Sequence, residues 1–300
     1  MQRSQSRRRG TAGAWDGGYG AHALIWGDHQ DRHPGNPTGQ PVLLLHGLPQ
    51  SPDVFEPLAG RLPRLGFRPI APYLYGHLFK RPRGLGDYQL ARFLETALAV
   101  ADRLELERFA VVGIGLGAAV GWMLAGRYPG RVSWLASIQF PHPAAAAAKV
   151  EWAVPLGGAL GSEADNRQWL TLDRPRMTQA LLKVRKWRVR QLLIEQGLPQ
   201  CHLDLYVERM SAPGALEVAL AWNAPEPPEQ LPQLNVPVLL VSNAGGHQAA
   251  PGRVQQLVPE GLAREAKLEG TRFPLECASS ELIALLEEHL PQRGKAPKRA

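Results

Sequence analysis

The chain has 300 residues, of which 44% are hydrophobic, and a formal net charge of +7. Eight of its 34 basic residues lie within residues 1–10 and 291–300, which hold no acid, so 26 basic residues face 27 acidic ones elsewhere. A nearly neutral body argues against a specific nucleic-acid surface, and two cysteines in a chain of this length exclude a disulfide framework. No run of about 18 apolar residues occurs, so we expect no transmembrane segment.

The two basic ends are predicted to be accessory to the fold. We expect residues 1–20 to form a flexible basic arm and residues 291–300 a basic tail. The arginines at 7–9 are similar to the start of a twin-arginine export signal, but the apolar stretch that such a signal needs does not follow. Cys201 and Cys277 lie in no metal-binding spacing, so both are interpreted as ordinary thiols. The expected location is the cytoplasm.

The first half of the chain alternates between strand and helix patterns. Continuous apolar runs bounded by turns are typical of strands buried on both faces of a parallel sheet. A short hairpin is predicted near residues 21–40. Strands are predicted at 41–47, 66–72, 107–115 and 132–140, and helices at 53–66, 87–106 and 116–130. This alternation indicates a mostly parallel, doubly wound α/β sheet.

The alternation stops at residue 141. Residues 145–230 have helical patterns and no buried-strand run, whereas residues 236–244 restore the strand pattern. A last strand is predicted at 263–270 and a closing helix at 279–290. The simplest organisation is one core in two parts, residues 21–140 and 231–290, interrupted by a helical cap at 141–230.

Three stretches, in order, carry a family resemblance. They are LLLHGLPQSPDVFEPLAGRLPRLGFRPIAP, VVGIGLGAAVGWMLAGRYPGRVSWLASIQFPHP, and APGALEVALAW followed by LNVPVLLVS. Together they resemble the α/β hydrolases of the epoxide-hydrolase and haloalkane-dehalogenase type over roughly residues 40–290. The resemblance implies an α/β-hydrolase fold with a cap and a catalytic triad at the carboxyl ends of the strands.

The triad positions that the resemblance assigns hold unsuitable residues. The family's nucleophile lies at the centre of a sharp strand-to-helix turn, G-x-nucleophile-x-G, which here makes Gly115 the central residue. Glycine cannot attack a substrate, although it adopts the strained backbone of that turn without penalty. The family's base corresponds to Arg272, which stays protonated and cannot accept a proton.

The third triad position, the acid, is also changed. It corresponds to Gly246, or to His247 after a shift of one residue, and neither is a carboxylate. Some relatives keep the acid after the preceding strand, but residues 137–140 contain none. His247 remains open as a displaced base or as an ordinary loop histidine. His46 and His142 match structural turns of the family.

Other positions implied by the resemblance concern ligand binding. The cap tyrosine that grips the epoxide oxygen in epoxide hydrolases corresponds to a position near Asn223. The turn at Gly47 and the backbone N–H groups of Leu48 and Leu116 are predicted to retain an oxyanion hole, because N–H groups at a helix start stabilise negative charge. We therefore expect ligand contacts at Gly47, Leu48, Gly115, Leu116, His247 and Asn223, with no metal and no cofactor.

Three hypotheses for function remain open at this stage. The chain is a pseudoenzyme that binds a small apolar ligand or a protein partner, because three separate catalytic functions are lost. Alternatively, it is a lyase, an isomerase or a cofactor-free oxidase that uses the oxyanion hole with His247 or Arg272. In the third hypothesis it is an ester, epoxide or haloalkane hydrolase whose catalytic residues have moved.

Overall fold

The computed structural model describes about half of the chain. The described residues are 13–16, 22–26, 39–47, 50–74, 90–139, 186–195, 197–211, 234–243, 257–259, 261–268, 273–277 and 280–290.

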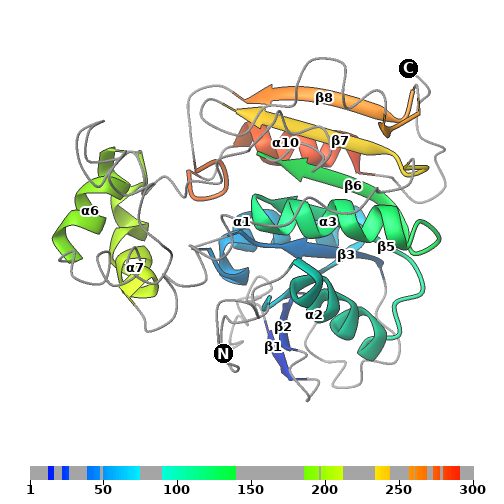
Figure 1. Ribbon diagram of the computed structural model, residues 1–300, viewed down its shortest axis with the longest axis horizontal. Helices are drawn as coiled ribbons and strands as arrows, with labels where there is room; N and C mark the ends of the chain where they lie inside the picture. The colour runs from blue at the N-terminus through cyan, green and yellow to red at the C-terminus, as the bar shows by residue number, and fades with distance from the viewer. Residues whose placement is uncertain are drawn as a thin grey trace, which may run out of the picture.

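An eight-stranded sheet forms the centre of the described structure (Figure 1). The six strands from β4 to β8 in sheet order run parallel, whereas β2 is antiparallel to both of its neighbours. In sheet order the strands are β1 (Gly13–Asp16), β2 (His22–Ile25), β4 (Phe67–Pro72), β3 (Gln40–Leu45), β5 (Phe109–Ile114), β6 (Val132–Ile138), β7 (Val238–Asn243) and β8 (Ala263–Leu268).

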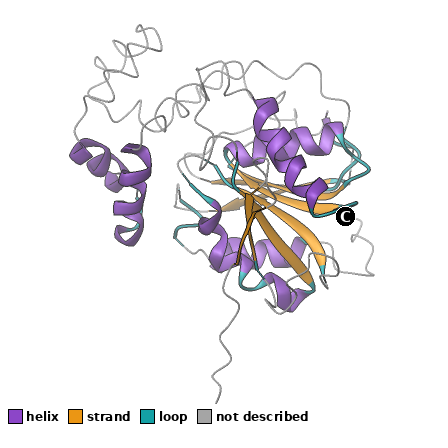
Figure 2. Cartoon of the chain, turned by 90° about the horizontal axis from the view of Figure 1, so that it is seen from below, coloured by secondary structure: helices purple, strands orange, loops and turns teal. Residues whose placement is uncertain are grey.

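Helices cover both faces of this sheet (Figure 2). One face packs against α2 (Leu90–Arg103) and α3 (Leu116–Arg127). The other packs against α1 (Glu56–Ala59) with the short 3-10 helices η1 (Pro52–Phe55) and η2 (Leu62–Leu65), and against α10 (Ser280–His289). This arrangement is the doubly wound architecture that the sequence predicted.

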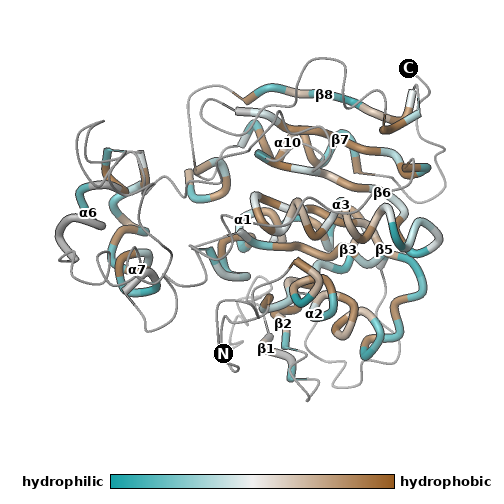
Figure 3. Tube along the Cα trace, in the orientation of Figure 1, coloured by the Kyte–Doolittle hydropathy of each residue, from teal (hydrophilic) through white to brown (hydrophobic). Residues whose placement is uncertain are grey.

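Alternation along the strands explains the two cores. Leu43 and Leu45 of β3 join the apolar cluster under α2 and α3, whereas Val42 and Leu44 join the cluster under α1 and α10. Successive side chains of a strand point to opposite faces, so a central strand needs apolar residues at every position. Figure 3 shows this continuous apolar character along the inner strands, in contrast to the more polar edge strand β8.

Two predicted elements differ from the structure. Residues 13–16, which we placed in a flexible arm, form β1, and β1 pairs with β2; the predicted hairpin at 21–40 is therefore wrong in its boundaries. The single helix predicted at 53–66 is broken into η1, α1 and η2. Pro57 and Pro63 stand at the starts of α1 and η2, where a missing N–H is tolerated, whereas each would interrupt a continuous helix.

Two further helices, α6 (Lys186–Glu195) and α7 (Gln200–Ser211), pack against each other and lie beyond the carboxyl ends of β6, β7 and β8 (Figure 1). They fall in the segment predicted to be helical. Among the described residues, no helix has the length and apolar character needed to cross a bilayer.

Candidate functional site

The turn between β5 and α3 is a single residue, Gly115. Its backbone angles are φ 52° and ψ −116°, a conformation that side-chain-bearing residues rarely adopt. Its N–H donates to the carbonyl oxygen of Ile138 at 3.1 Å, and its own carbonyl accepts the N–H of Ala119 at 3.1 Å. The strand thus passes directly into the helix, and this is the sharp turn that the sequence predicted.

The flanking glycines of this turn are required by close packing, but the central one is not. A Cβ on Gly117 would lie 1.8 Å from the carbonyl oxygen of Leu45, and one on Gly113 would lie 2.5 Å from the carbonyl oxygen of Gly117. Among the described residues, a Cβ on Gly115 would meet the Cα of Gly47 alone, at 4.0 Å. No described atom therefore occupies the place of a side chain at the centre of the turn, where the chain has a glycine.

His46, directly before Gly47, is occupied by backbone groups. The N–H of Leu74 donates to its Nε2 at 3.3 Å, so Nδ1 carries the ring proton and donates to the carbonyl oxygen of Gly47 at 2.8 Å. The ring is buried, with 1% of its surface exposed. This arrangement agrees with the structural role predicted for His46.

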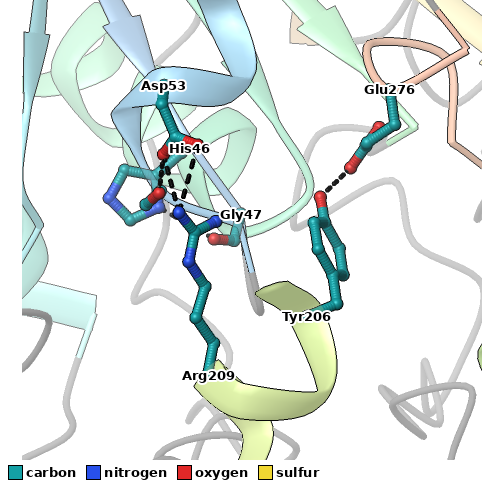
Figure 4. Close-up of polar contacts among 7 residues, drawn as sticks. His46, Gly47, Asp53, Tyr206, Arg209 and Glu276 are labelled. Carbon is teal, nitrogen blue, oxygen red and sulfur yellow. Dashed lines mark hydrogen bonds and ion pairs between the residues drawn. The ribbon is translucent and has the colours of Figure 1, made fainter. Parts of the chain in front are cut away.

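A buried polar network links Gly47 to Glu276 and Tyr206, and Figure 4 shows the contact between Tyr206 and Glu276. The N–H of Gly47 donates to Oε1 of Gln50 at 3.0 Å, and Nε2 of Gln50 donates to Oε1 of Glu276 at 2.7 Å. The hydroxyl of Tyr206, on α7, donates to the same carboxylate oxygen. Glu276 is 5% exposed. One carboxylate therefore joins the loop after β3, the turn at 273–277 and α7.

A second contact joins α7 to the core loop. Nη2 of Arg209 lies 3.0 and 3.1 Å from the two carboxylate oxygens of Asp53, which also accepts the hydroxyl of Ser51. Nε2 of His202 lies 3.2 Å from the carbonyl oxygen of Glu276. Spacings of three and four residues place side chains on one face of a helix, so His202, Tyr206 and Arg209 form the face of α7 that meets the core.

The end of β6 was the alternative position for an acid. Oγ of Ser137 is fully buried and accepts the indole N–H of Trp122 at 2.8 Å. Gln139, one residue past β6, has φ 62°, and it is one of two described non-glycine residues with a positive φ. Residues 137–139 contain no carboxylate.

The predicted site residues divide into two groups. Gly47, Gly115 and Leu116 lie together, with Leu116 as the first residue of α3. The other predicted positions, Leu48, Asn223, Gly246, His247 and Arg272, lie outside the described residues, as does His142. No group of His, Cys, Asp or Glu side chains within the described ranges could hold a metal ion.

Sequence reasoning missed the network around Glu276. The spacing of His202, Tyr206 and Arg209 was a usable signal for one helix face, but nothing in it specified which core residues the face would meet. Gln50 and Glu276 are 226 positions apart. Only the fold brings them together, because both follow strands whose carboxyl ends share one edge of the sheet.

The environment of Tyr206 gives a pH-dependent prediction. Burial, and then the adjacent Glu276 carboxylate, raises the pKa of Tyr206 well above its ordinary value of 10.0. Above pH 10 the unfolded chain releases the proton of Tyr206, whereas the folded protein still holds it. The stabilisation by the protonated Tyr206 hydroxyl is therefore complete below about pH 10 and declines as the pH rises further. We expect the stability advantage of the wild type over Tyr206→Phe to be constant from pH 7 to about 9 and to shrink above pH 10.

Urea unfolding of both proteins across pH 7–11 measures this difference. The raised pKa of Tyr73, caused mainly by burial, contributes equally to both proteins and cancels. Two stability profiles that stay parallel through pH 11 would show that Tyr206 has no raised pKa in the folded state.

The comparisons with known proteins agree with this geometry. The family model for the alpha/beta hydrolase fold matches residues 40–190. This range holds β3, the turn at Gly115 and β6, so the chain belongs to the α/β-hydrolase fold family. Among curated proteins, the AB hydrolase superfamily protein YisY of Bacillus subtilis is 25% identical over 76% of this chain and 79% of its own length.

Other relatives match shorter stretches. The AB hydrolase superfamily protein YfhM of Bacillus subtilis is 30% identical over 36% of this chain, and the match covers only 38% of that relative. The 2-hydroxymuconate semialdehyde hydrolase of Pseudomonas putida is 30% identical over 49% of this chain and 53% of its own length.

Solved structures extend the similarity of the fold to most of the chain. An epoxide hydrolase from Vigna radiata superposes with a TM-score of 0.68 at 18% identity, covering 94% of this chain and 98% of that one. Epoxide Hydrolase A from Mycobacterium thermoresistibile superposes with a TM-score of 0.66 at 19% identity, covering 96% and 100%. At these identities the similarity concerns the fold, which is epoxide-hydrolase-like.

Proposed function

We propose that this chain is a pseudoenzyme of the α/β-hydrolase fold family, one that binds a small, mainly apolar ligand without hydrolysing it. The observation that carries the proposal is Gly115. The turn keeps the strained backbone and the close packing through Gly113 and Gly117, yet its central residue has no side chain, although no described atom would block one. A covalent step at this turn has no atom to begin it.

The remaining triad positions support the same proposal. By the family resemblance the acid position is Gly246 or His247, and the base position is Arg272. His46, the histidine next to the turn, donates and accepts hydrogen bonds with backbone groups. No described residue therefore offers a nucleophile paired with a base at Gly115.

The ligand site we propose lies between the sheet edge and a helical cap formed by residues 141–230. Within that segment, the described helix α7 contacts the core through Tyr206 and Arg209. In open α/β sheets, ligands bind outside the carboxyl ends of the strands, which is where α7 meets the core. The base of this site would consist of Gly47, Gly115 and Leu116. We further propose that the protein is cytoplasmic.

Native mass spectrometry of the freshly purified full chain tests the proposal. We expect a fraction of the protein to carry a non-covalent small molecule that organic extraction removes, with the extracted protein as the control. A bare protein mass, together with no binding of apolar probes by the extracted chain, would contradict ligand binding. A co-purifying protein in stoichiometric amount would instead favour a protein partner.

A further inference from the structure

The two cysteines of the chain both lie where α7 meets the core. Cys201 is the second residue of α7, and Cys277 ends the turn at 273–277. Each is the sequence neighbour of a residue that joins these two elements, because Nε2 of His202 lies 3.2 Å from the carbonyl oxygen of Glu276. The contacting residues are 74 positions apart in the chain. The fold therefore brings the surroundings of two distant thiols together.

The contact is made at the backbone of Cys277. The carbonyl carbon of Glu276 is bonded to the nitrogen of Cys277, so the ring of His202 reaches the peptide group that joins these two residues. The N–H of Cys277 donates to the carbonyl oxygen of Phe273 at 2.9 Å, which closes the turn. The rings of Phe273 and Tyr206 meet edge to face, with centroids 6.3 Å apart. Both ends of the turn thus lie against the first two turns of α7.

Both thiols are open to solvent. Cys201 and Cys277 are exposed, whereas Tyr206 and Glu276, which join the same two elements, are buried (Figure 4). The cysteines therefore stand at the rim of this junction, where a small reagent reaches them. Susceptibility of a thiol to oxidation increases with its exposure, and two thiols on facing elements can also react with each other.

We propose that Cys201 and Cys277 form a reversible disulfide that ties α7 to the turn at 273–277. A disulfide requires a separation of roughly 4.4–6.8 Å between the two Cα atoms. Side chains of α7 hold it against the core here, and such contacts adjust more readily than strand pairing, so the start of α7 can adopt this separation. The bond depends on this junction and not on the proposed ligand-binding function.

The oxidant in this reaction is a small disulfide such as oxidised glutathione. One protein thiolate attacks its S–S bond, which forms a mixed disulfide and releases one glutathione thiolate. The second protein thiolate then attacks the protein sulfur of the mixed disulfide, which forms the bond between the two cysteines and releases the second glutathione. Two electrons pass from the protein thiols to the oxidant, and their two protons end on the two glutathione molecules. Excess reduced glutathione reverses both steps.

Equilibration of the full chain with mixtures of reduced and oxidised glutathione tests the inference. The fraction of chains with the internal bond, measured by mass spectrometry after the remaining thiols are blocked, gives the effective concentration of one cysteine at the other. We expect this value to be at least about tenfold higher in the folded protein than in urea, because folding replaces a long flexible connection by a defined junction. Peptide mapping should find Cys201 joined to Cys277, and Cys277→Ser should yield mixed disulfides alone.

Hydrogen exchange measures whether the bond holds the helix. The amides of α7 should exchange more slowly in the oxidised protein than in the reduced one, because the bond opposes separation of α7 from the core. The amides of α2, which contains no cysteine and packs on the sheet, serve as the control and should exchange equally in both forms.

Three results would overturn the inference. Glutathione attached to both cysteines without a bond between them, or bonds between separate chains alone, would contradict the disulfide. Equal effective concentrations in the folded and the unfolded chain would show that the fold does not bring the thiols together. An oxidised protein in which α7 exchanges as fast as in the reduced form would show that the bond does not hold the helix.

Discussion

Gly117→Ala is expected to lower the free energy of unfolding by about 3 kcal/mol or more, at or beyond the upper end of typical overpacking costs. The added Cβ would lie 1.8 Å from the carbonyl oxygen and 2.3 Å from the carbonyl carbon of Leu45. Both atoms belong to the backbone at the end of β3, so no side-chain rotation relieves the overlap. Either α3 or β3 must move, although β3 lies inside the sheet and α3 packs directly on it.

Gly130→Ala is the matched control for this experiment. Gly130 is exposed, and a Cβ there would meet no atom within 4 Å. Its effect on stability should stay within about 0.5 kcal/mol. Urea unfolding of the wild type and both variants gives the comparison. A Gly117→Ala protein as stable as Gly130→Ala would mean that α3 does not approach β3 as described.

Trp122→Ala is expected to cost about 3–5 kcal/mol. Trp122 is among the largest side chains that are completely buried, and it belongs to the apolar cluster between α3 and the sheet. Its removal leaves a cavity at the centre of that cluster and takes a hydrogen-bond donor away from Ser137. The loss of apolar contact and the lost hydrogen bond act in the same direction.

Trp122→Phe separates the two contributions. Phenylalanine keeps much of the apolar volume but cannot donate to Ser137, so it should cost clearly less than alanine. Chemical denaturation of the three proteins, with equal slopes against urea, provides the ranking. If alanine cost no more than phenylalanine, the apolar contact of Trp122 would not be the main source of its contribution.

Much of the fold was predictable because the inner strands have a simple chemical requirement. A strand such as residues 109–114, buried on both faces, must be apolar throughout, and this is visible without structural information. The edges were harder to predict. The pairing of residues 13–16 with β2 depends on backbone hydrogen bonds at the sheet edge, where the side-chain pattern imposes little constraint.

The site was predictable where glycine spacing encodes backbone geometry. The turn at Gly115 was located through the family resemblance of the residues on both sides of it, and the structure shows that Gly113 and Gly117 are fixed there by contacts with backbone atoms. The network of Gln50, Tyr206 and Glu276 could not be located from the sequence, because each residue type is ordinary for its local element. The network forms only through long-range contacts that join the loop after β3, the turn at 273–277 and α7.

In the proposed pseudoenzyme, the glycine at the centre of the turn permits ligand binding but offers no side chain for a covalent step. By the family resemblance, hydrolysis would need a nucleophile at Gly115 and a base in place of Arg272. Since these positions come from distant parts of the chain, a single compensating change cannot supply both. Binding of a ligand, by contrast, requires neither of these groups.

Turnover assays on the purified full chain with ester, epoxide and haloalkane substrates decide between these alternatives. A protein without a nucleophile at position 115 should show no hydrolysis above the buffer rate with any of the three classes. Hydrolysis well above that rate, which follows the protein through a further purification step, would contradict the pseudoenzyme proposal.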